Sequence, residues 1–275
     1  MVRGSCKGAV LTLIRTVAET GSTNADMLAA AKAGAVEGSW LRAERQSAGR
    51  GRLGRAWVST AGNLYASTLV RVRATDPQAA TLALVAGVAV EEAVAVCLNL
   101  RHPRLDPGFR CLDPSARRSG TPDEVRGDGQ SGLQLKWPND LLLDGAKLAG
   151  ILLERANDAV VIGIGANLAH HPDLPDRPAT SLAAHGIDVH PAAFLETLAE
   201  TFARWRARWR GEGLAPIRTR WLERAHAVGT ALTARLPDDT AIDGLFDGLD
   251  AGGALILRLA GGERRVIHAA DVFLL

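Results

Sequence analysis

The sequence contains little cysteine and almost no net charge. Its three cysteines, Cys6, Cys97 and Cys111, show neither a pairing pattern nor metal-site spacing, which argues against a disulfide framework and fits a reducing compartment. The 32 basic residues nearly balance the 30 acidic ones, whereas a dedicated nucleic-acid binder carries a marked basic excess. We therefore expect neither a disulfide-stapled protein nor one whose main ligand is a nucleic acid.

Long hydrophobic runs are missing as well. The N-terminus lacks the continuous apolar core of a signal peptide, and the longest weakly polar run, residues 77–90, is too short to span a bilayer. The 275 residues, 47% of them apolar and 23% charged, have the ordinary composition of a globular protein with one large domain, or one large and one small domain. We predict a cytoplasmic protein that does not contact a membrane.

Between residues 44 and 57 the sequence interleaves glycine with arginine, a composition that suits neither a stable helix nor a packed strand. Glycine lets backbone N–H groups come close to a ligand, and arginine offers pairs of donors that match phosphate or carboxylate oxygens. The stretch predicts a loop that closes over a small anion. A solvated basic turn and an RNA-binding segment remain alternatives on this stretch alone.

A second polar motif, Ser22-Thr23-Asn24, stands directly before an alanine-rich helical run. Thr23 is predicted as the N-cap, with Asp26 three residues later, and Gly34 is predicted to end the helix. A helix N-terminus with spare hydroxyls can also bind a polar ligand group. Capping and ligand binding are compatible at this motif.

Strands are predicted at residues 39–44 and 64–71, on either side of the Gly-Arg loop. Asp76-Pro77 has the pattern of a helix start, and we predict a buried helix from there to about residue 98 that lies across a sheet. Residues 101–132 are rich in proline, glycine and charge without apolar periodicity. Such a segment buries too little to offset its ordering entropy, so we expect a surface excursion.

The next strand leads into the turn Trp137-Pro138-Asn139-Asp140. Alternation places Leu133 and Leu135 on one face and Lys136 on the other. A lone strand lysine is commonly a solvated edge residue. Lys136, however, immediately precedes a turn, where catalytic groups tend to cluster, and we therefore single it out as a candidate catalytic group.

Two further short apolar strands are predicted at 147–154 and 160–167. Gly163 and Gly165 leave one side of the second strand bare, which permits a flat group to lie against its backbone; tight sheet packing is the alternative. Apolar residues at 3,4,3,4 spacing from Leu195 to Trp209 predict a core helix. Trp221 stands apart from that stripe, and stacking on a purine is one hypothesis for it.

The last fifty residues alternate short apolar segments with pairs of glycines, which predicts a small antiparallel barrel as a second domain. This rhythm differs from the helical spacing that precedes it. We place the change near residue 226.

Four motifs in this order, 49–55, 136–140, 147–150 and 163–167, together with 22–24, resemble those of the biotin–protein ligases. The resemblance extends from about residue 12 to the end of the sequence. It implies an α+β fold, in which a mixed β-sheet flanked by helices, of the class II synthetase type, forms a catalytic domain over 1–225. Residues 101–132 have no counterpart in the family's pattern and would be a flexible insertion in that domain, and residues 226–275 would form an SH3-like β-barrel.

The resemblance also implies a two-step ligase reaction. Biotin and ATP, with Mg²⁺, would give biotinyl-5′-AMP and pyrophosphate, and a lysine of a biotin carboxyl carrier protein would then take the biotin. By this likeness Ser22, Thr23 and Gln46 hold the ureido end of biotin, while Arg50 and Arg52 meet its carboxylate and the phosphate. Lys136 and Arg52 are the implied catalytic residues, and Asn167 and Trp221 the implied adenine neighbours. The other implied substrate-binding residues are Asn24, Gly49, Gly51, Asn139, Gly150, Gly163 and Gly165. Asp140 could order a metal ion or the loop.

Some members of this family carry an N-terminal helix-turn-helix domain and repress transcription. Here the matching part begins close to Met1, so we expect no DNA partner, and we expect a monomer or a homodimer. A lipoate ligase, which would share the fold and the adenylation chemistry, is an alternative function, although it should show a different glycine-rich signature. A non-enzymatic module that binds nucleic-acid phosphates is another, and the balanced charge argues against it.

Overall fold

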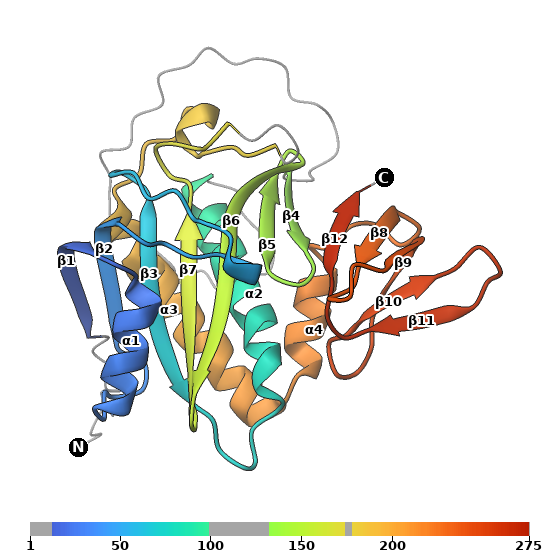
Figure 1. Cartoon of the computed structure of the whole chain (residues 1–275), viewed down its shortest axis with the longest axis horizontal. Helices are drawn as coiled ribbons and strands as arrows, with labels where there is room; N and C mark the ends of the chain where they lie inside the picture. Colours follow the sequence, from blue (N-terminus) through green and yellow to red (C-terminus); the bar gives the residue numbers. More distant parts are fainter. Residues whose placement is uncertain (1–12, 99–131, 174–177, 275) are drawn as a thin grey trace, which may run out of the picture.

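The computed structural model describes residues 13–98, 132–173 and 178–274, which form a large mixed β-sheet and a smaller antiparallel sheet beside it (Figure 1). The large sheet has the order β1-β2-β3-β7-β6-β5-β4. Its first two strands are parallel, and all its other neighbouring pairs are antiparallel. The strands are β1 (Ile14–Thr20), β2 (Trp40–Gln46), β3 (Leu64–Arg71), β4 (Leu133–Lys136), β5 (Asp140–Leu143), β6 (Ala146–Ala156) and β7 (Ala159–Ala166).

Helices cover both faces of this sheet. The helices are α1 (Thr23–Lys32), α2 (Leu82–Cys97), α3 (Pro191–Glu212) and α4 (Ala215–Leu222). Alternation along β7 shows the two faces: Val161 packs against Met27 of α1, whereas Ile162 belongs to the main core with α2 and α3. The helix α1 therefore lies on one face and α2 and α3 on the other, as Figure 1 shows. This arrangement confirms the predicted α+β class.

The predicted strand 64–71 has the bounds of β3, and the predicted aromatic stripe is buried along α3. The buried helix, in contrast, begins later than predicted. A 3₁₀ turn at Ala79–Thr81 precedes α2, and Asp76 does not cap it, because its carboxylate accepts hydrogen bonds from Arg210 and from the Arg73 N–H. Among the described residues one helical stretch, Ala79–Cys97, is apolar and long enough to cross a membrane, and 78% of its window is buried inside the protein.

Two strands are absent from the sequence prediction. β1 is an edge strand with mostly exposed side chains, and β5 has only four residues between two turns. Neither offers the alternation that identifies a longer, half-buried strand. The predicted excursion at 101–132 falls almost wholly outside the described residues.

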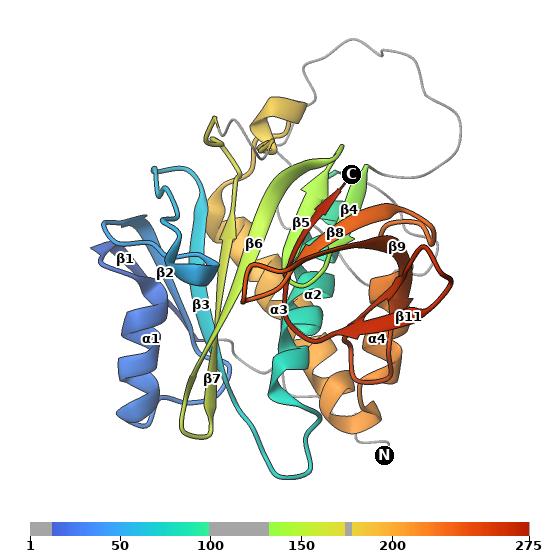
Figure 2. The same ribbon diagram turned by 45° about the vertical axis from the view of Figure 1, so that its right-hand side comes forward.

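The small sheet has the order β11-β10-β9-β8-β12, and all its neighbouring pairs are antiparallel. Its strands are β8 (Ala231–Arg235), β9 (Ala241–Leu249), β10 (Leu255–Arg258), β11 (Arg264–Ile267) and β12 (Asp271–Leu274). Several bonds attach it to the rest of the chain, among them one from Trp137 Nε1 to the Gly253 carbonyl at 3.1 Å and one from Arg218 Nε to the Leu249 carbonyl at 2.8 Å. β12 thereby stands beside the β4–β5 hairpin (Figure 2).

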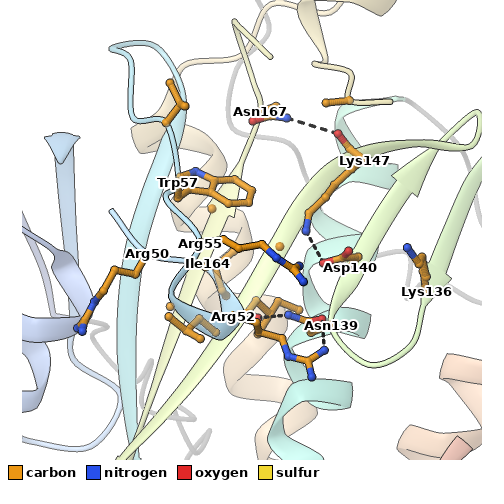
Figure 3. A pocket seen from close by; sticks show the side chains of 18 of the residues that line it. Arg50, Arg52, Arg55, Trp57, Lys136, Asn139, Asp140, Lys147, Ile164 and Asn167 are labelled. Atoms are coloured by element: carbon orange, nitrogen blue, oxygen red, sulfur yellow. Dashed lines mark hydrogen bonds and ion pairs between the residues drawn. The ribbon is translucent and has the colours of Figure 1, made fainter. Parts of the chain in front are cut away.

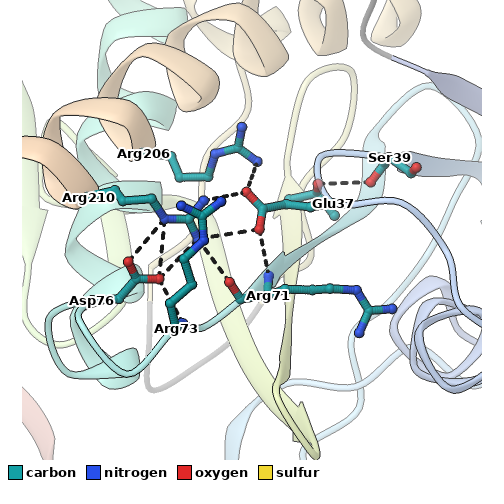
Figure 4. Close-up of polar contacts among 8 residues, drawn as sticks. Glu37, Ser39, Arg71, Arg73, Asp76, Arg206 and Arg210 are labelled. Carbon is teal, nitrogen blue, oxygen red and sulfur yellow. Dashed lines mark hydrogen bonds and ion pairs between the residues drawn. The ribbon is translucent and has the colours of Figure 1, made fainter.

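A cluster of ion pairs joins α3 to the loop between α1 and β2 and to the loop that follows β3 (Figure 4). Glu37 accepts from Arg210 at 2.7 Å, lies 3.1 Å from Arg206, and accepts from the Arg71 backbone N–H at 3.0 Å. Burial tends to raise the pKa of Glu37, but the hydrogen bonds from Arg210 and Arg71 and the two guanidinium charges outweigh it and lower the pKa below its ordinary 4.5. The pKa of Asp76 is also lowered, because Arg210 and the Arg73 N–H outweigh its burial.

We expect Glu37→Gln to reduce the free energy of unfolding at neutral pH by about 2 kcal/mol, the usual value of hydrogen bonds to a charged group. A carboxylate whose pKa is lowered by folding stabilises the native state above its unfolded pKa, and this contribution is lost as the pH falls through the folded pKa. The difference between parent and variant should therefore shrink on acidification from about pH 5. Denaturant unfolding at several pH values measures it.

Glu212→Gln is the matched control, because Glu212 pairs with Arg208 on the exposed side of the same helix. We expect this control to leave stability nearly unchanged. Equal losses in the two variants would contradict a special role of the Glu37 cluster.

Candidate active site

A pocket of about 480 Å³ opens on the α1 face of the large sheet (Figure 3). Six parts of the chain line it: the start of α1, the end of β2 with the loop between β2 and β3, the start of β3, the β4–β5 hairpin with the adjoining parts of β6 and β7, the segment that follows β7, and β12 of the small sheet. The predicted site residues that line it are Ser22, Thr23, Asn24, Gln46, Arg50, Gly51, Arg52, Lys136, Asn139, Asp140, Gly150, Gly163, Gly165 and Asn167. The sequence motifs therefore converge on one pocket.

One end of the pocket is built from uncharged polar groups. Gln46 Oε1 accepts hydrogen bonds from the Thr23 backbone N–H at 2.8 Å and from its hydroxyl at 3.1 Å, while Gln46 Nε2 donates to Ser59 Oγ at 3.2 Å. The fully buried Ser67 hydroxyl lies 2.8 Å from Thr23 Oγ1. These contacts fix the orientation of each donor and acceptor before a ligand arrives. Thr23 is not the N-cap that the sequence predicted: Ser22 holds that position, and the Thr23 side chain bonds to Gln46 instead.

Asn24 extends this polar end to a charged pair. Its Oδ1 accepts from Ser67 Oγ at 2.7 Å, and its Nδ2 donates to Glu154 Oε2 at 2.8 Å. Glu154 also pairs with Arg50 at 3.4 Å. A Cβ atom at Gly163 would lie 2.3 Å from Asn24 Oδ1, so the bare strand position exists to admit this amide.

The indole of Trp57 lies against the other glycines. Gly150 of β6 and Gly165 of β7 are directly paired across the two strands, and a Cβ atom at these positions would lie 3.1 Å and 2.6 Å from the ring. The flat group predicted to rest on this backbone is thus a side chain of the protein itself. Lys147 Nζ lies 5.6 Å from the ring centroid, within the range of a cation–π contact.

Gly49 differs from the other predicted glycines, because it supports the loop rather than lining the pocket. A Cβ atom there would lie 2.7 Å from the Trp57 carbonyl oxygen and 2.8 Å from Ser59 Oγ. The Trp57 N–H donates to the Gly49 carbonyl at 2.9 Å, which closes the base of the loop. Gly49 therefore shapes the loop that presents the arginines.

The loop arginines form ion pairs with carboxylates from two different sheets. Arg50 turns toward Glu154, whereas Arg52 and Arg55 both pair with Asp271 of β12, Arg52 at 3.4 Å. In Figure 3, Arg50 points away from the pair formed by Arg52 and Arg55. Arg52 and Arg55 therefore share one carboxylate, while Arg50 lines the same pocket with a different partner.

Lys136 and the following turn complete the cationic side. Lys136 projects from the face of β4 opposite to the buried Leu135, as predicted, and its Nζ lies 5.8 Å from the ring centroid of Phe273. Burial, together with the positive charge of Lys136, lowers the pKa of His226, so this imidazole is neutral beside the lysine at neutral pH.

Asn139 and Asp140 fix the turn to its neighbours. Asn139 Nδ2 donates to the Ile151 carbonyl at 2.5 Å, and its Oδ1 lies 3.5 Å from Arg52 Nη1. Asp140 Oδ1 accepts from Lys147 Nζ at 2.6 Å. Among the described residues, no three His, Cys, Asp or Glu side chains are grouped as a protein-held metal site would need.

The two residues predicted to lie near adenine, Asn167 and Trp221, occupy different places: one lines the pocket and the other lies in the core. Asn167 lines the pocket, and its Nδ2 donates to the carbonyl of Thr180 at 3.0 Å. Trp221 does not: it is 2% exposed on α4, and its ring lies beside Gly87 of α2. The hypothesis that Trp221 stacks on a purine is therefore wrong for this structure, because the core surrounds its ring.

Sequence reasoning missed Trp57, Arg55, Lys147 and Asp271 as pocket residues. Arg55 ends the glycine-rich motif 49–55, Trp57 follows it closely, and Lys147 opens the motif 147–150, so proximity to these motifs is a signal that could have identified them. Asp271 has no such signal. It reaches the pocket through the packing of the small sheet.

The sequence model of the biotin/lipoate A/B protein ligase family matches residues 22–167, just over half of the chain. This chain belongs to the biotin/lipoate A/B protein ligase family. A second model, the biotin protein ligase C terminal domain, matches residues 229–275. The resemblance to biotin–protein ligases noted in the sequence is therefore confirmed, and the chain is a ligase of this family.

Two curated ligases of the family resemble the chain over nearly its whole length. The biotin–[acetyl-CoA-carboxylase] ligase of Paracoccus denitrificans is 40% identical over 94% of this chain and 98% of its own length. The protein of the same name from Mycobacterium tuberculosis is 35% identical over 93% of this chain and 86% of its own length. The biotin protein ligase from Aquifex aeolicus in complex with biotin and ATP superposes with a TM-score of 0.76 at 22% identity, covering 96% of this chain and 100% of the other, which establishes the shared fold.

In this ligase, Gly165→Ala should disturb the loop, because its Cβ atom would overlap the Trp57 ring. We expect a loss of stability of about 1–3 kcal/mol, the usual cost of overpacking, and faster hydrogen exchange in residues 49–57. Gly211→Ala is the control: Gly211 lies within α3 with no neighbour near its added Cβ, so alanine should leave stability unchanged or raise it. Unchanged exchange in the Gly165 variant would show that the loop does not depend on this contact.

Proposed function

We propose that this ligase joins biotin to ATP, giving biotinyl-5′-AMP and pyrophosphate, and then transfers the biotin to a lysine of a biotin carboxyl carrier domain with release of AMP. The observation that carries the proposal is the division of the pocket into an uncharged polar end and a cationic side. Biotin has the matching chemistry, with a neutral ureido group at one end and a carboxylate at the other. We place the reaction in the cytoplasm, in accordance with the cysteine usage.

The polar end suits the ureido group. Ser22, Thr23 and Gln46 line this end with hydroxyl and amide groups, and a urea needs both donors and acceptors. A neutral ligand group does not require a counter-ion there. Asn24 and Glu154 extend the same network on its far side.

The cationic side suits the reacting groups. The carboxylate of biotin must approach the α-phosphate of ATP, and both are anions, so the barrier is largely electrostatic and positional. Arg52 and Lys136 would stabilise the charge that develops between the two reactants. Arg55, which the sequence analysis did not include, would join them.

Trp57 offers the aromatic surface that the sequence analysis had assigned to Trp221. Its ring lines the pocket beside Lys147, and Asn167 lies at the same end (Figure 3). Aromatic rings bind the π-faces of bases without regard to hydrogen-bond pattern, which makes Trp57 the proposed neighbour of adenine. Asn167 would add polar contacts at the edge of the base.

Mg²⁺ enters this proposal bound to the phosphates of ATP. The ion commonly takes one or two carboxylates together with substrate phosphates, and Asp140 on the β4–β5 turn fits such a single-carboxylate role. The described residues do not form a complete protein-held site, which agrees with an ion that arrives on the nucleotide. When bound, it would neutralise phosphate charge.

The adenylate is a mixed anhydride that water would hydrolyse, so it must be shielded until the carrier lysine arrives. The loop from Gly49 to Trp57 lines the pocket and is held by the contact of Trp57 with Gly150 and Gly165 and by the ion pairs of its arginines. Such contacts can open without unfolding the sheet. The loop would therefore both shield the intermediate and admit the acceptor.

Isotope exchange between ATP and pyrophosphate tests the first step directly. We expect exchange that depends on biotin and that lipoate does not support, because the uncharged polar end matches a ureido group and not a dithiolane. Equal exchange with lipoate would assign the chain to the other branch of its family. Absence of exchange with both acids would contradict the adenylation step itself.

Lys136→Ala should lower biotin-dependent exchange by about a hundred- to a thousandfold, the usual effect of removing a donor from a reacting centre. The side chain points away from the core, so the variant should retain its melting temperature. Lys32→Ala is the control, because Lys32 lies exposed in the last turn of α1 outside the pocket. Near-normal exchange by a folded Lys136 variant would remove this residue from the mechanism.

A further inference from the structure

The strand β12 of the small sheet brings a carboxylate into the anion-binding side of the pocket. Asp271 is mostly buried, with 13% of its side chain exposed, and it pairs with both Arg52 and Arg55. Arg52 also donates to the carbonyl of Ala270 at 3.2 Å. Two of the arginines that would meet a ligand anion thus already have an anionic partner from the protein.

We propose that Asp271 is a built-in counter-ion of Arg52 and Arg55 that a ligand anion must displace, and that it thereby selects polyphosphates over anions of low charge. The assignment of this polyphosphate to ATP rests on the proposed function. The competition between Asp271 and an anion for the two arginines does not rest on the proposed function, because it depends only on the charges of these three residues.

The selectivity for polyphosphates follows from a comparison of Asp271 with a free anion as the partner of the two arginines. Asp271 is attached to a strand that pairs with β8 along its whole length, so it is presented to the arginines at a high effective concentration. A free monocarboxylate offers similar contacts and must also give up its translational freedom, so it gains little by the exchange. A chain of phosphates offers several charges and can bond to both guanidinium groups at once.

Replacement of Asp271 by a bound polyphosphate would also weaken the attachment of the small sheet to the loop. The Asp271 pairs and the bond to the Ala270 carbonyl connect β12 to the loop. When a polyphosphate takes over the two arginines, these connections are released. Binding of the anion would therefore loosen the N-terminal end of β12.

Asp271→Asn tests the proposal, because it removes the charge and keeps the shape. We expect this variant to bind inorganic tripolyphosphate about tenfold more tightly than the parent in calorimetry without biotin, a change that corresponds to about 1.4 kcal/mol. Selectivity should fall with it, so that inorganic monophosphate binding, which we expect to be too weak to measure in the parent, becomes measurable. Structural damage to the site would weaken both anions instead.

Asp247→Asn is a closely matched control. Asp247 lies in the same small sheet, 11% of its side chain is exposed, and it pairs with Arg264 at 2.6 Å outside the pocket. Both variants change the net charge by one unit, so the control measures the long-range electrostatic effect. Asp271→Glu retains the competing carboxylate and should bind tripolyphosphate with an affinity close to that of the parent.

The proposal is overturned if folded Asp271→Asn binds tripolyphosphate no more tightly than Asp247→Asn does. A second measurement uses the unaltered protein: tripolyphosphate should speed hydrogen exchange in residues 270–274, and unchanged or slower exchange there would also overturn the proposal. These readouts need neither biotin nor turnover. Failure of biotin-dependent pyrophosphate exchange would therefore contradict the proposed function without contradicting the proposed role of Asp271.

Discussion

The contact between Trp57 and a pair of glycines fixes the position of the whole loop that carries Arg50, Arg52 and Arg55. Gly150 and Gly165 face each other across β6 and β7, and together they leave a patch of bare backbone wide enough for an indole. Because a Cβ atom at Gly165 would overlap the ring, the contact depends on this residue type. With Trp57 in place, the arginines that precede it in the chain must lie over the mouth of the pocket.

Close contacts also hold the strand that carries Lys136 to the segment that joins α4 to the small sheet. The N–H of Leu135 donates to the Arg224 carbonyl at 2.6 Å, so the segment after α4 pairs with the strand that carries the lysine. Arg224 and Arg220 both form ion pairs with Glu91, which is completely buried on α2. Burial raises the pKa of Glu91, although the two arginines oppose the change. Removing Glu91 would leave Arg224 without its carboxylate partner in a poorly solvated place, which is costly, so this segment is firmly held.

Local patterns in the sequence were sufficient to predict much of the fold and the site. Alternation identified the face of Lys136, and the helical spacing of apolar residues identified α3, because each signal depends only on neighbouring residues. Trp221 and Asp271 could not be predicted in this way. The first was assigned to the ligand although the core encloses it, and the second reaches the pocket through contacts between segments far apart in sequence.

The bond between Arg52 and the Ala270 carbonyl joins residues separated by 218 positions along the chain. Contacts of such long range form late in folding, because the entropy of closing the intervening chain must be met before they contribute. During synthesis the loop arginines emerge well before the strand that neutralises them. A nascent chain therefore exposes uncompensated positive charge next to an unfinished sheet, and the site becomes electrically balanced only when the small sheet has docked.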